Sequence, residues 1–355
     1  MVSADSVKLV LQKGNLEIDD SSARGAKSTC CRKPWCLFCC TCCTPRCTCI
    51  GLSVLFGLIG LFFVGPRLGP SAFGEDWISS KRPMVISHGD CPCLPEPANS
   101  LLWFEYAAGL GVDALEMDLM LTADGEIITF HDKSWENLSN GTGSVRETTV
   151  SYMEKHIDVS GSYSKYDGMI ISPPLLEEVL STFSGNPEIR FNMEIKTELK
   201  DRVLVAETLC RTLRNYDVIG RTLVASFDTE NLDAVRKECG NELATSSSEA
   251  ETRSALVPII LGLDLWAWWP NKKPNGEISV MQLPVEGGGF RLTEKKIIDR
   301  LHGHGVAVMY WVINDRETML ELIANGADGI ITDEVETFRE VMAEAGKALP
   351  VPFSQ

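Results

Sequence analysis

Short β-branched runs alternate with amphipathic stretches from about Trp77 onward, and this alternation constrains the fold more than any other feature of the sequence. Apolar runs bounded by turn residues are typical of buried strands, and strands that alternate with helices indicate a parallel sheet. The predicted strands are Met84–His88, Ala114–Asp118, Ile127–His131, Ile189–Lys196, Thr222–Phe227, Val257–Leu261, Ile278–Leu283, Val306–Val312 and Gly329–Thr332. The predicted helices are Ser100–Leu110, Leu175–Ser184, Leu199–Tyr216, Thr229–Glu238, Thr293–His304 and Arg316–Ala324.

Eight or so strands in a body of this length predict an α/β fold, a TIM-type (β/α)8 barrel. The competing fold is an open doubly wound sheet, but no GxGxxG motif follows an early strand. The glycines Gly287, Gly288 and Gly289 lack the Lys-Ser/Thr of a P-loop, so we interpret them as a turn.

The charge is divided between the two ends of the chain. The whole sequence has a formal net charge of −16, which argues against a general nucleic-acid binder because such a protein needs a basic face. Residues 1–49 carry a surplus of three positive charges, so the rest of the chain carries −19. An acidic body therefore follows a separate, basic front end.

An uncharged apolar run from Ile50 to Gly65 follows nine cysteines that lie between Cys30 and Cys49. A run of this length spans about 24 Å as a helix, and we predict a single transmembrane helix over residues 50–66. Cysteines beside such a helix are typical of S-palmitoylation sites; a zinc site is the alternative, although no His lies in the cluster.

The basic residues favour a cytoplasmic N-terminus and a lumenal or extracellular catalytic domain. The sequons at Asn137 and Asn140 agree with that orientation. The expected organisation is a polar, then Cys-rich segment (1–49), a transmembrane helix (50–66), a linker (67–82), a barrel (83–345) and a C-terminal tail (346–355).

Ionisable residues close four of the predicted strands. His88 ends the first strand and His131 ends the third, while Glu116 and Asp118 share one face of the second at i, i+2. Glu194 and Lys196 repeat that spacing: Glu194 would be the third carboxylate beside Glu116 and Asp118. Three carboxylates at a barrel mouth predict a Mg²⁺ or Ca²⁺ site, and two nearby imidazoles suit proton transfer.

The short connection between Asp118 and His131 is a difficulty for this site. Asp124 and Gly125 are typical of a hairpin, which by itself would carry His131 to the far end of the sheet from Asp118. For both to share one mouth, as the family resemblance given next implies, Leu119–Ala123 would have to run back as an extended link.

The same residues resemble the glycerophosphodiester phosphodiesterase family over about Pro83 to Phe338. The resemblance rests on HGD, PEPAN, GVDALEMDLMLTADGEIITFHD, PPLLEEVL, NMEIK, ASFDTENL and YWVINDRETMLELIANGADGIITD. It implies that His88 and His131 are the acid and base, and that Glu116, Asp118 and Glu194 bind a divalent metal ion. It also implies that Lys196 binds phosphate and that Trp311 lines the pocket. Membrane-anchored eukaryotic members, which act on lysophospholipids and glycerophosphodiesters, are the most similar in organisation.

Two positions depart from the family pattern. The arginine that follows the first histidine in the family is Gly89 here, and Gly cannot grip a phosphodiester as an arginine does. The Glu-Asn pair is split into Glu96 and Asn99, so that loop should differ. Lys196, the metal ion or a distant arginine such as Arg291 could compensate.

The expected function is metal-dependent cleavage of glycerophosphodiesters to glycerol 3-phosphate and an alcohol. The attacking oxygen is either the substrate's own glycerol 2-hydroxyl, which would give a cyclic phosphate, or a water. The alternatives are a lysophospholipase D and a non-catalytic phospholipid-binding barrel that lost turnover with its arginine. Trp266, Trp268 and Trp269 could form a lipid-facing lip or simply pack, and we expect Cys91 and Cys93 as free thiols. The oligomeric state is not predicted.

Overall fold

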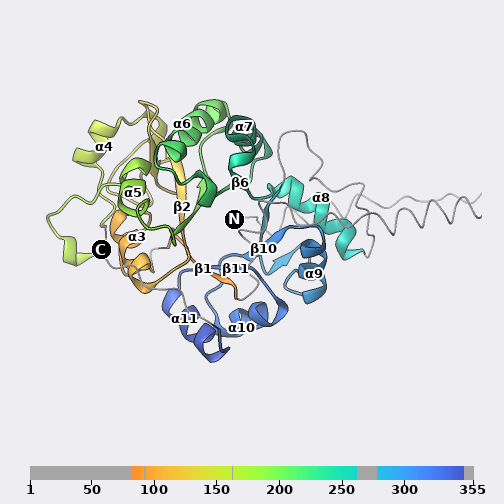
Figure 1. Cartoon of the computed structure of the whole chain (residues 1–355). Helices are drawn as coiled ribbons and strands as arrows, with labels where there is room; N and C mark the ends of the chain where they lie inside the picture. The colour runs from red at the N-terminus through yellow and green to blue at the C-terminus, as the bar shows by residue number, and fades with distance from the viewer. Residues whose placement is uncertain (1–81, 92, 162, 262–277, 348–355) are drawn as a thin grey trace, which may run out of the picture.

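The computed structural model describes residues 82–261 and 278–347, except residues 92 and 162 (Figure 1). The predicted transmembrane segment 50–66, the cysteine cluster and the three tryptophans at 266–269 lie outside these residues. Within the described part, none of the helices combines the length and apolar character needed to cross a bilayer.

Eight parallel strands in the described residues build the central sheet, which confirms the predicted fold class. They follow the order β6-β5-β4-β2-β1-β11-β10-β7. Their bounds are β1 Met84–Ser87, β2 Ala114–Leu121, β4 Arg190–Ile195, β5 Thr222–Ala225, β6 Ala244–Thr245, β7 Val280–Leu283, β10 Ala307–Tyr310 and β11 Gly329–Thr332. The two outer strands, β6 and β7, meet through a parallel bridge between Ser246 and Val280, so the sheet curls into a nearly closed barrel.

A helix follows each of these strands and lies on the outside of the barrel (Figure 1). The outer helices are α3 Leu101–Leu110, α5 Leu176–Phe183, α6 Arg202–Asn215, α7 Thr229–Cys239, α8 Glu249–Ile260, α9 Lys295–Gly303, α10 Arg316–Asn325 and α11 Val335–Glu344. Short 3-10 turns occupy Val145–Glu147, Ser164–Tyr166, Leu199–Asp201, Ile219–Arg221 and Gly240–Glu242. The small hairpin of β8 (Glu286–Gly287) and β9 (Phe290–Arg291) contains the predicted glycine turn.

The alternation of side chains between the two faces of each strand determines where the site lies. One set of strand side chains, including Ile86, Ala114 and Ala307, forms the core inside the barrel, while the other set packs against the helices. Because side chains two positions apart share a face, the inward set continues past Ile86 to His88 and past Ala114 to Glu116 and Asp118. The barrel core therefore leads directly to the polar residues at the carboxyl ends.

An excursion between β2 and α5 stands beside the mouth. Strand β2 continues past Asp118 to Leu121, and β3 (Ile127–Thr129) pairs with this extension in antiparallel register. The backbone amide of Phe130 donates to the carbonyl of Asp118 at 2.9 Å, so the hairpin returns His131 to the level of Asp118. His131 and Asp118 thus lie at one mouth as expected, but the extended link predicted over Leu119–Ala123 was wrong, because β2 continues to Leu121 and pairs there with β3.

The rest of the excursion has its own small core. Helix α4 (Val150–His156) and the chain around it bury Phe130, Trp135 and Met153 against Met120 and Ile128 of the hairpin. The phenyl ring of Phe130 and the indole of Trp135 lie 4.8 Å apart. This packing holds the segment that carries His131.

Two further expectations need correction, and one disulfide was not predicted. Val257–Leu261, predicted as a strand, lies at the end of α8 and the residue that follows it. Cys91 and Cys93, expected as free thiols, form a disulfide, since their Cα atoms lie 5.1 Å apart, within the usual range. A second disulfide, not predicted, joins Cys210 of α6 to Cys239 of α7.

Candidate active site

The three predicted acidic ligands converge at the carboxyl end of the barrel. Asp118 of β2 and Glu194 of β4 are register partners, and Glu116 lies one inward position below Asp118. One carboxylate oxygen from each of the three lies within 4.8 Å of the others. Glu116 and Asp118 are buried, with 5% and 2% of their surface exposed.

The loop after β1 holds two of these carboxylates. The amide of Gly89 donates to Glu116 Oε2 at 2.7 Å, and Asn99 Nδ2 donates to Asp118 Oδ2 at 2.9 Å. Asn99 Oδ1 in turn accepts from the amide of Asp118. Despite the two residues that separate Glu96 from Asn99, the asparagine reaches the site, whereas Glu96 pairs with Lys165 and accepts from Tyr166 at the rim. The sequence alone did not identify Asn99 as a site residue.

Gly89 is packed too closely for a side chain. A Cβ atom built at this position would lie 2.7 Å from the carbonyl oxygen of Glu116 and 3.2 Å from Asn99 Oδ1. Real Cβ atoms essentially never approach backbone oxygen this closely. The family arginine therefore cannot be accommodated here without a shift of this loop.

His88 is paired with a carboxylate at the end of β11. Its Nδ1 lies 2.8 Å from Asp333 Oδ1, and Asn314 Nδ2 donates to the other oxygen of Asp333 at 2.6 Å. Burial by itself lowers the pKa of His88, but the hydrogen bond to Asp333 and the negative charge of Glu116 outweigh it, so the pKa rises to about 9. At neutral pH His88 is therefore protonated.

His131 lies between two carboxylates. Its Nδ1 is 2.7 Å from Asp132 Oδ1, and Asn137 donates to the other oxygen of Asp132. Its Nε2 is 3.5 Å from Asp90 Oδ2. With Nδ1 bonded to Asp132, Nε2 is the nitrogen that faces the reaction space. Asp90 and Asp333 are, like Asn99, site residues that the sequence did not identify.

Lys196 supplies positive charge beside the carboxylates. Its Nζ lies 2.9 Å from Glu194 Oε1 and 3.4 Å from Asp118 Oδ1. Burial lowers the pKa of Lys196, but these two charges outweigh it and raise the pKa well above the ordinary value. Arg291, the other residue expected to compensate for the missing arginine, is engaged by Glu321.

Two aromatic rings stand beside Lys196. Its Nζ lies 5.9 Å from the ring centre of Phe227, and the indole of Trp311 meets that ring edge-on at 6.0 Å. Trp311 Nε1 donates to the carbonyl of Gln282 at 3.0 Å, which fixes the orientation of the indole. Phe227 and Trp311 thus form an apolar wall.

The acidic cluster fits a divalent cation. Burial and the charge of Asp118 raise the pKa of Glu116 to about 8, and burial also raises the pKa of Glu194, although Lys196 opposes this. Buried carboxylates that repel one another are stabilised by a cation, and hard oxygen donors suit Mg²⁺ or Ca²⁺. Glu116, Asp118 and Glu194 are therefore the residues that could hold the metal.

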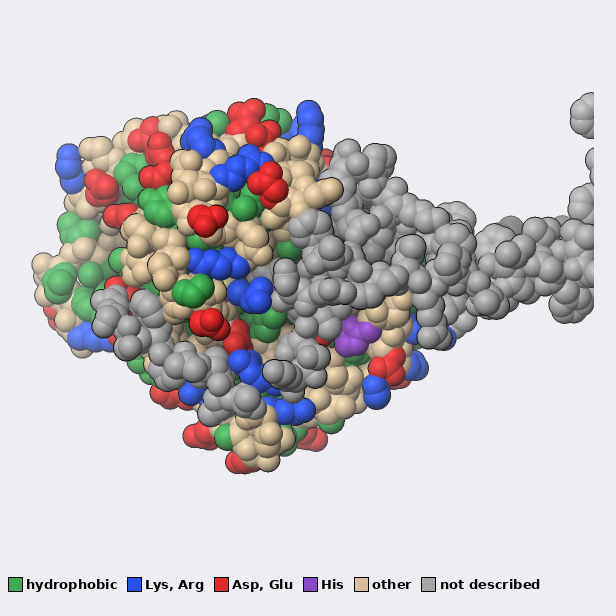
Figure 2. Space-filling view, in the orientation of Figure 1, with side chains coloured by type: hydrophobic (Ala, Val, Ile, Leu, Met, Phe, Trp, Pro, Cys, Tyr) green, Lys and Arg blue, Asp and Glu red, His purple; other side chains and the backbone are tan. Residues whose placement is uncertain are grey.

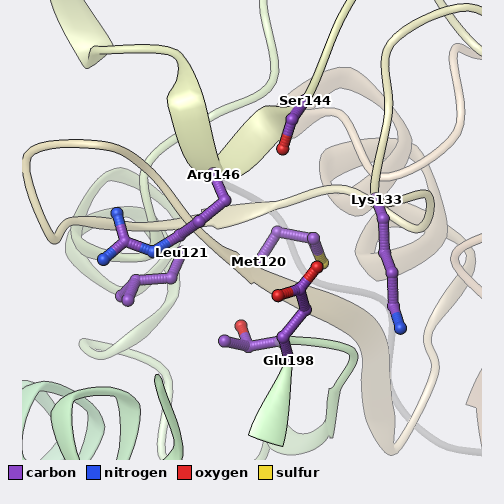
Figure 3. Close-up of a pocket in the computed structure, with 7 residues that line it drawn as sticks. Met120, Leu121, Lys133, Ser144, Arg146 and Glu198 are labelled. Atoms are coloured by element: carbon purple, nitrogen blue, oxygen red, sulfur yellow. The ribbon is translucent and has the colours of Figure 1, made fainter. Parts of the chain in front are cut away.

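A pocket of about 230 Å³, part of it open to solvent, adjoins the site. Its lining includes residues that directly follow site residues in sequence, Lys133 after Asp132, and Thr197 and Glu198 after Lys196. Figure 3 shows Lys133 and Arg146 on opposite sides of the pocket, with Glu198 between them. Thr197 is buried, and its hydroxyl has no hydrogen-bond partner among the described residues.

The outer surface in this orientation carries mixed charge. Figure 2 shows Lys and Arg side chains interspersed with Asp and Glu side chains over the described part of this face.

Comparison with known proteins decides the family. The model of the glycerophosphoryl diester phosphodiesterase family matches residues 88–337, which is well over half of the chain. The chain belongs to this family. The resemblance seen in the sequence motifs is thereby confirmed, and the protein is an enzyme of the phosphodiesterase class.

Relatives of this phosphodiesterase include bacterial and mammalian proteins. It is 27% identical over 271 residues to a glycerophosphodiester phosphodiesterase of Caldanaerobacter subterraneus subsp. tengcongensis, covering 75% of this chain and 100% of that protein. It is 26% identical over 270 residues to a lysophospholipase D of Rattus norvegicus, covering 69% of this chain and 81% of the relative.

Solved structures of phosphodiesterases share the fold. A phosphodiesterase of Oleispira antarctica, solved with the product sn-glycerol-3-phosphate, has a TM-score of 0.58 at 20% identity and covers 74% of this chain and 97% of its own. A glycerophosphodiester phosphodiesterase of Agrobacterium tumefaciens has a TM-score of 0.56 at 19% identity, with coverage of 72% and 98%. The phosphodiesterase described here therefore has the barrel fold of these structures.

Proposed function

We propose that this protein is a metal-dependent glycerophosphodiester phosphodiesterase that releases glycerol 3-phosphate and an alcohol. The observation that carries the proposal is the meeting of Glu116, Asp118 and Glu194 at one barrel mouth, beside two imidazoles that are each paired with a carboxylate. The names of the bacterial relatives support the substrate class.

The metal ligands would be Glu116, Asp118 and Glu194, with Mg²⁺ or Ca²⁺ as the ion. When bound, such an ion would neutralise negative charge on the non-bridging phosphate oxygens. The ammonium of Lys196 lies next to two of the three carboxylates. Lys196 would therefore supply the positive charge that the family arginine would otherwise bring. Trp311 and Phe227 bound the space in which the phosphodiester would lie.

The hydrogen bonds favour different roles for the two histidines. His88, with a pKa raised to about 9, carries a proton at neutral pH and would give it to the oxygen of the leaving alcohol. Asp132 holds Nδ1 of His131, so Nε2 would take the proton from the attacking oxygen. That oxygen is the glycerol 2-hydroxyl of the substrate or a water.

A lysophospholipid is the second candidate substrate. The rat relative is named a lysophospholipase D, and the apolar run at 50–66 would place the enzyme at a membrane where such lipids reside. We further propose a cytoplasmic N-terminus and a lumenal or extracellular barrel. The two disulfides in the barrel support that orientation, since disulfides persist in oxidising compartments.

The proposal is tested by assaying the full-length protein in detergent on glycerophosphocholine and lysophosphatidylcholine, with and without Mg²⁺ or Ca²⁺. We expect metal-dependent release of choline. His131→Ala should reduce the rate by at least about 100-fold, the contribution typical of general acid–base catalysis, with an unchanged circular dichroism spectrum.

His156→Ala is the matched control, because His156 lies exposed on α4 and should leave the rate unaltered. A lack of product from both substrates under all metal conditions would instead support the non-catalytic phospholipid-binding barrel. Full activity in His131→Ala would contradict the assigned base.

A further inference from the structure

Asp90 lies in the reaction space but has no part in the mechanism above. It is the third residue of the HGD motif and follows directly on Gly89. One of its carboxylate oxygens lies within 4.8 Å of ligand atoms of both Asp118 and His131. Asp90 therefore borders both the acidic cluster and the imidazole proposed as the base.

One oxygen of Asp90 lacks a partner. Oδ1 is fully buried and has no hydrogen bond to any described residue, while Oδ2 lies 3.5 Å from His131 Nε2, too far for a good hydrogen bond. A buried acceptor without a donor is destabilising, so such an atom is normally satisfied by a water or a ligand. The oxygen that borders Nε2 of His131 is Oδ2, so a donor placed beside Nε2 can also reach the carboxylate of Asp90.

We propose that Asp90 orients the water that opens a cyclic phosphate intermediate at this site, an inference that rests on the function proposed above. In the first step the glycerol 2-hydroxyl oxygen bonds to phosphorus and the bond to the alcohol breaks. His131 takes the hydroxyl proton and His88 protonates the alcohol. Between the two steps His131 gives its proton to solvent and His88 takes one up, so both return to their starting states. In the second step a water oxygen bonds to phosphorus and the ring P–O bond breaks. His131 then takes one water proton, and the released ring oxygen gains a proton from His88, leaving glycerol 3-phosphate.

The two acceptors beside the reacting phosphorus, His131 Nε2 and the carboxylate of Asp90, favour a water between them over a substrate hydroxyl. His131 Nε2 and the carboxylate of Asp90 face one space, and together they require two donated protons. A substrate hydroxyl has a single proton, which goes to His131 in the first step. A water has two, so it can donate one to Asp90 while the other is transferred to His131. Asp90 is therefore matched to the second step and not to the first.

The test measures how the products divide between cyclic glycerol phosphate and glycerol 3-phosphate, by phosphorus NMR, with the full-length protein and glycerophosphocholine. The wild type should give chiefly glycerol 3-phosphate and should also hydrolyse added cyclic glycerol phosphate. In Asp90→Gly, which removes the carboxylate, choline release should continue. The ratio of cyclic to open product should rise about 10- to 100-fold, the value of a hydrogen bond to a charged group. Asp90→Asn, which keeps one acceptor oxygen, should give a smaller rise.

Asp132→Asn is the matched control, because it also removes a carboxylate next to His131 but on the opposite nitrogen. It should slow both steps and leave the product ratio unaltered. An equal rise in the ratio in both variants, or no rise in Asp90→Gly, would overturn the inference. So would a raised KM for glycerophosphocholine with an unaltered ratio, since Asp90 would then bind the headgroup. Absence of choline release by the wild type would refute the proposed function itself, and the inference with it.

Discussion

At the scale of single residues, each imidazole of the site depends on a carboxylate. Asp333 fixes Nδ1 of His88 and Asp132 fixes Nδ1 of His131, so both rings present Nε2 to the reaction space. Asn314 and Asn137 in turn donate to these carboxylates. The chain thus sets the orientation of both rings before substrate arrives.

Asp333→Asn should move the alkaline limb of the pH–rate profile to lower pH. His88 acts as an acid, so activity is lost as the pH rises through its pKa, which is raised to about 9. Removing the charge of Asp333 lowers that pKa toward the ordinary value near 6.5, and the limb should follow it. The profile of kcat/KM between pH 6 and 10 checks this. An unmoved limb would mean that His88 is not the acid.

The sequence predicted the site residues that share a strand, and missed those that depend on loops. The i, i+2 spacing identifies two pairs, Glu116 with Asp118 and Glu194 with Lys196, because it puts both members of a pair on one face of a strand. Asn99 and Asp90 contact the site only through the path of the loop after β1, which no periodicity encodes. Asp333 does follow an apolar strand, so the signal that identified His88 would also have found it.

At the scale of elements, the excursion after β2 shows where local patterns fall short. The turn at Asp124 and Gly125 was recognised, and Gly125 indeed adopts φ +86°. The path of Leu119–Ala123 was nevertheless wrongly predicted as an extended link, because the path depends on how far β2 continues past Asp118. That extension is stabilised by the small core around Trp135, which forms from residues distant in the sequence.

Helix α8 shows a different kind of error: the sequence contains a signal for the start of a helix, but the apolar run that follows was given more weight. The apolar residues Val257–Leu261 suggested a strand, yet Ser248 and Glu251 form a capping box that starts a helix nine residues earlier. The barrel strand that follows β5, Ala244–Thr245, has only two residues. A strand this short is defined by its pairing with β5 and not by its own pattern.

The disulfide between α6 and α7 should stabilise the barrel. It closes a loop of 29 residues, and restricting the unfolded chain by a loop of this size contributes about 3 to 4 kcal/mol. Cys210→Ala/Cys239→Ala should therefore lower the free energy of unfolding by about that amount, measured by urea denaturation. Cys91→Ala/Cys93→Ala is the control, because these cysteines are only two residues apart in the sequence. This variant should lose clearly less free energy of unfolding. Equal losses would contradict the loop-length argument.

At the scale of the whole molecule, the position of the site relative to the apolar run matters. Strand β1 enters the barrel at Met84, at the end opposite to the carboxyl ends where the site lies. The predicted linker of residues 67–82 spans at most about 55 Å when fully extended. That reach is longer than the barrel is tall, so the linker allows the mouth to face the membrane in which residues 50–66 would be inserted.

Membrane insertion should therefore matter for lipid substrates and not for soluble ones. Leu58→Arg/Leu61→Arg places two charges at the centre of the apolar run, at about 2.5 to 3.5 kcal/mol each, and should release the protein from carbonate-washed membranes. Activity on glycerophosphocholine should stay within about twofold of the wild-type activity. Activity on lysophosphatidylcholine in vesicles should fall at least about tenfold, because only an anchored enzyme meets a bilayer substrate at high local concentration. Leu58→Ile/Leu61→Ile keeps the apolar run and should alter neither activity. A parallel loss of both activities would show that the substitution damages the barrel, and a protein that stays in the washed membranes would show that residues 50–66 are not its anchor.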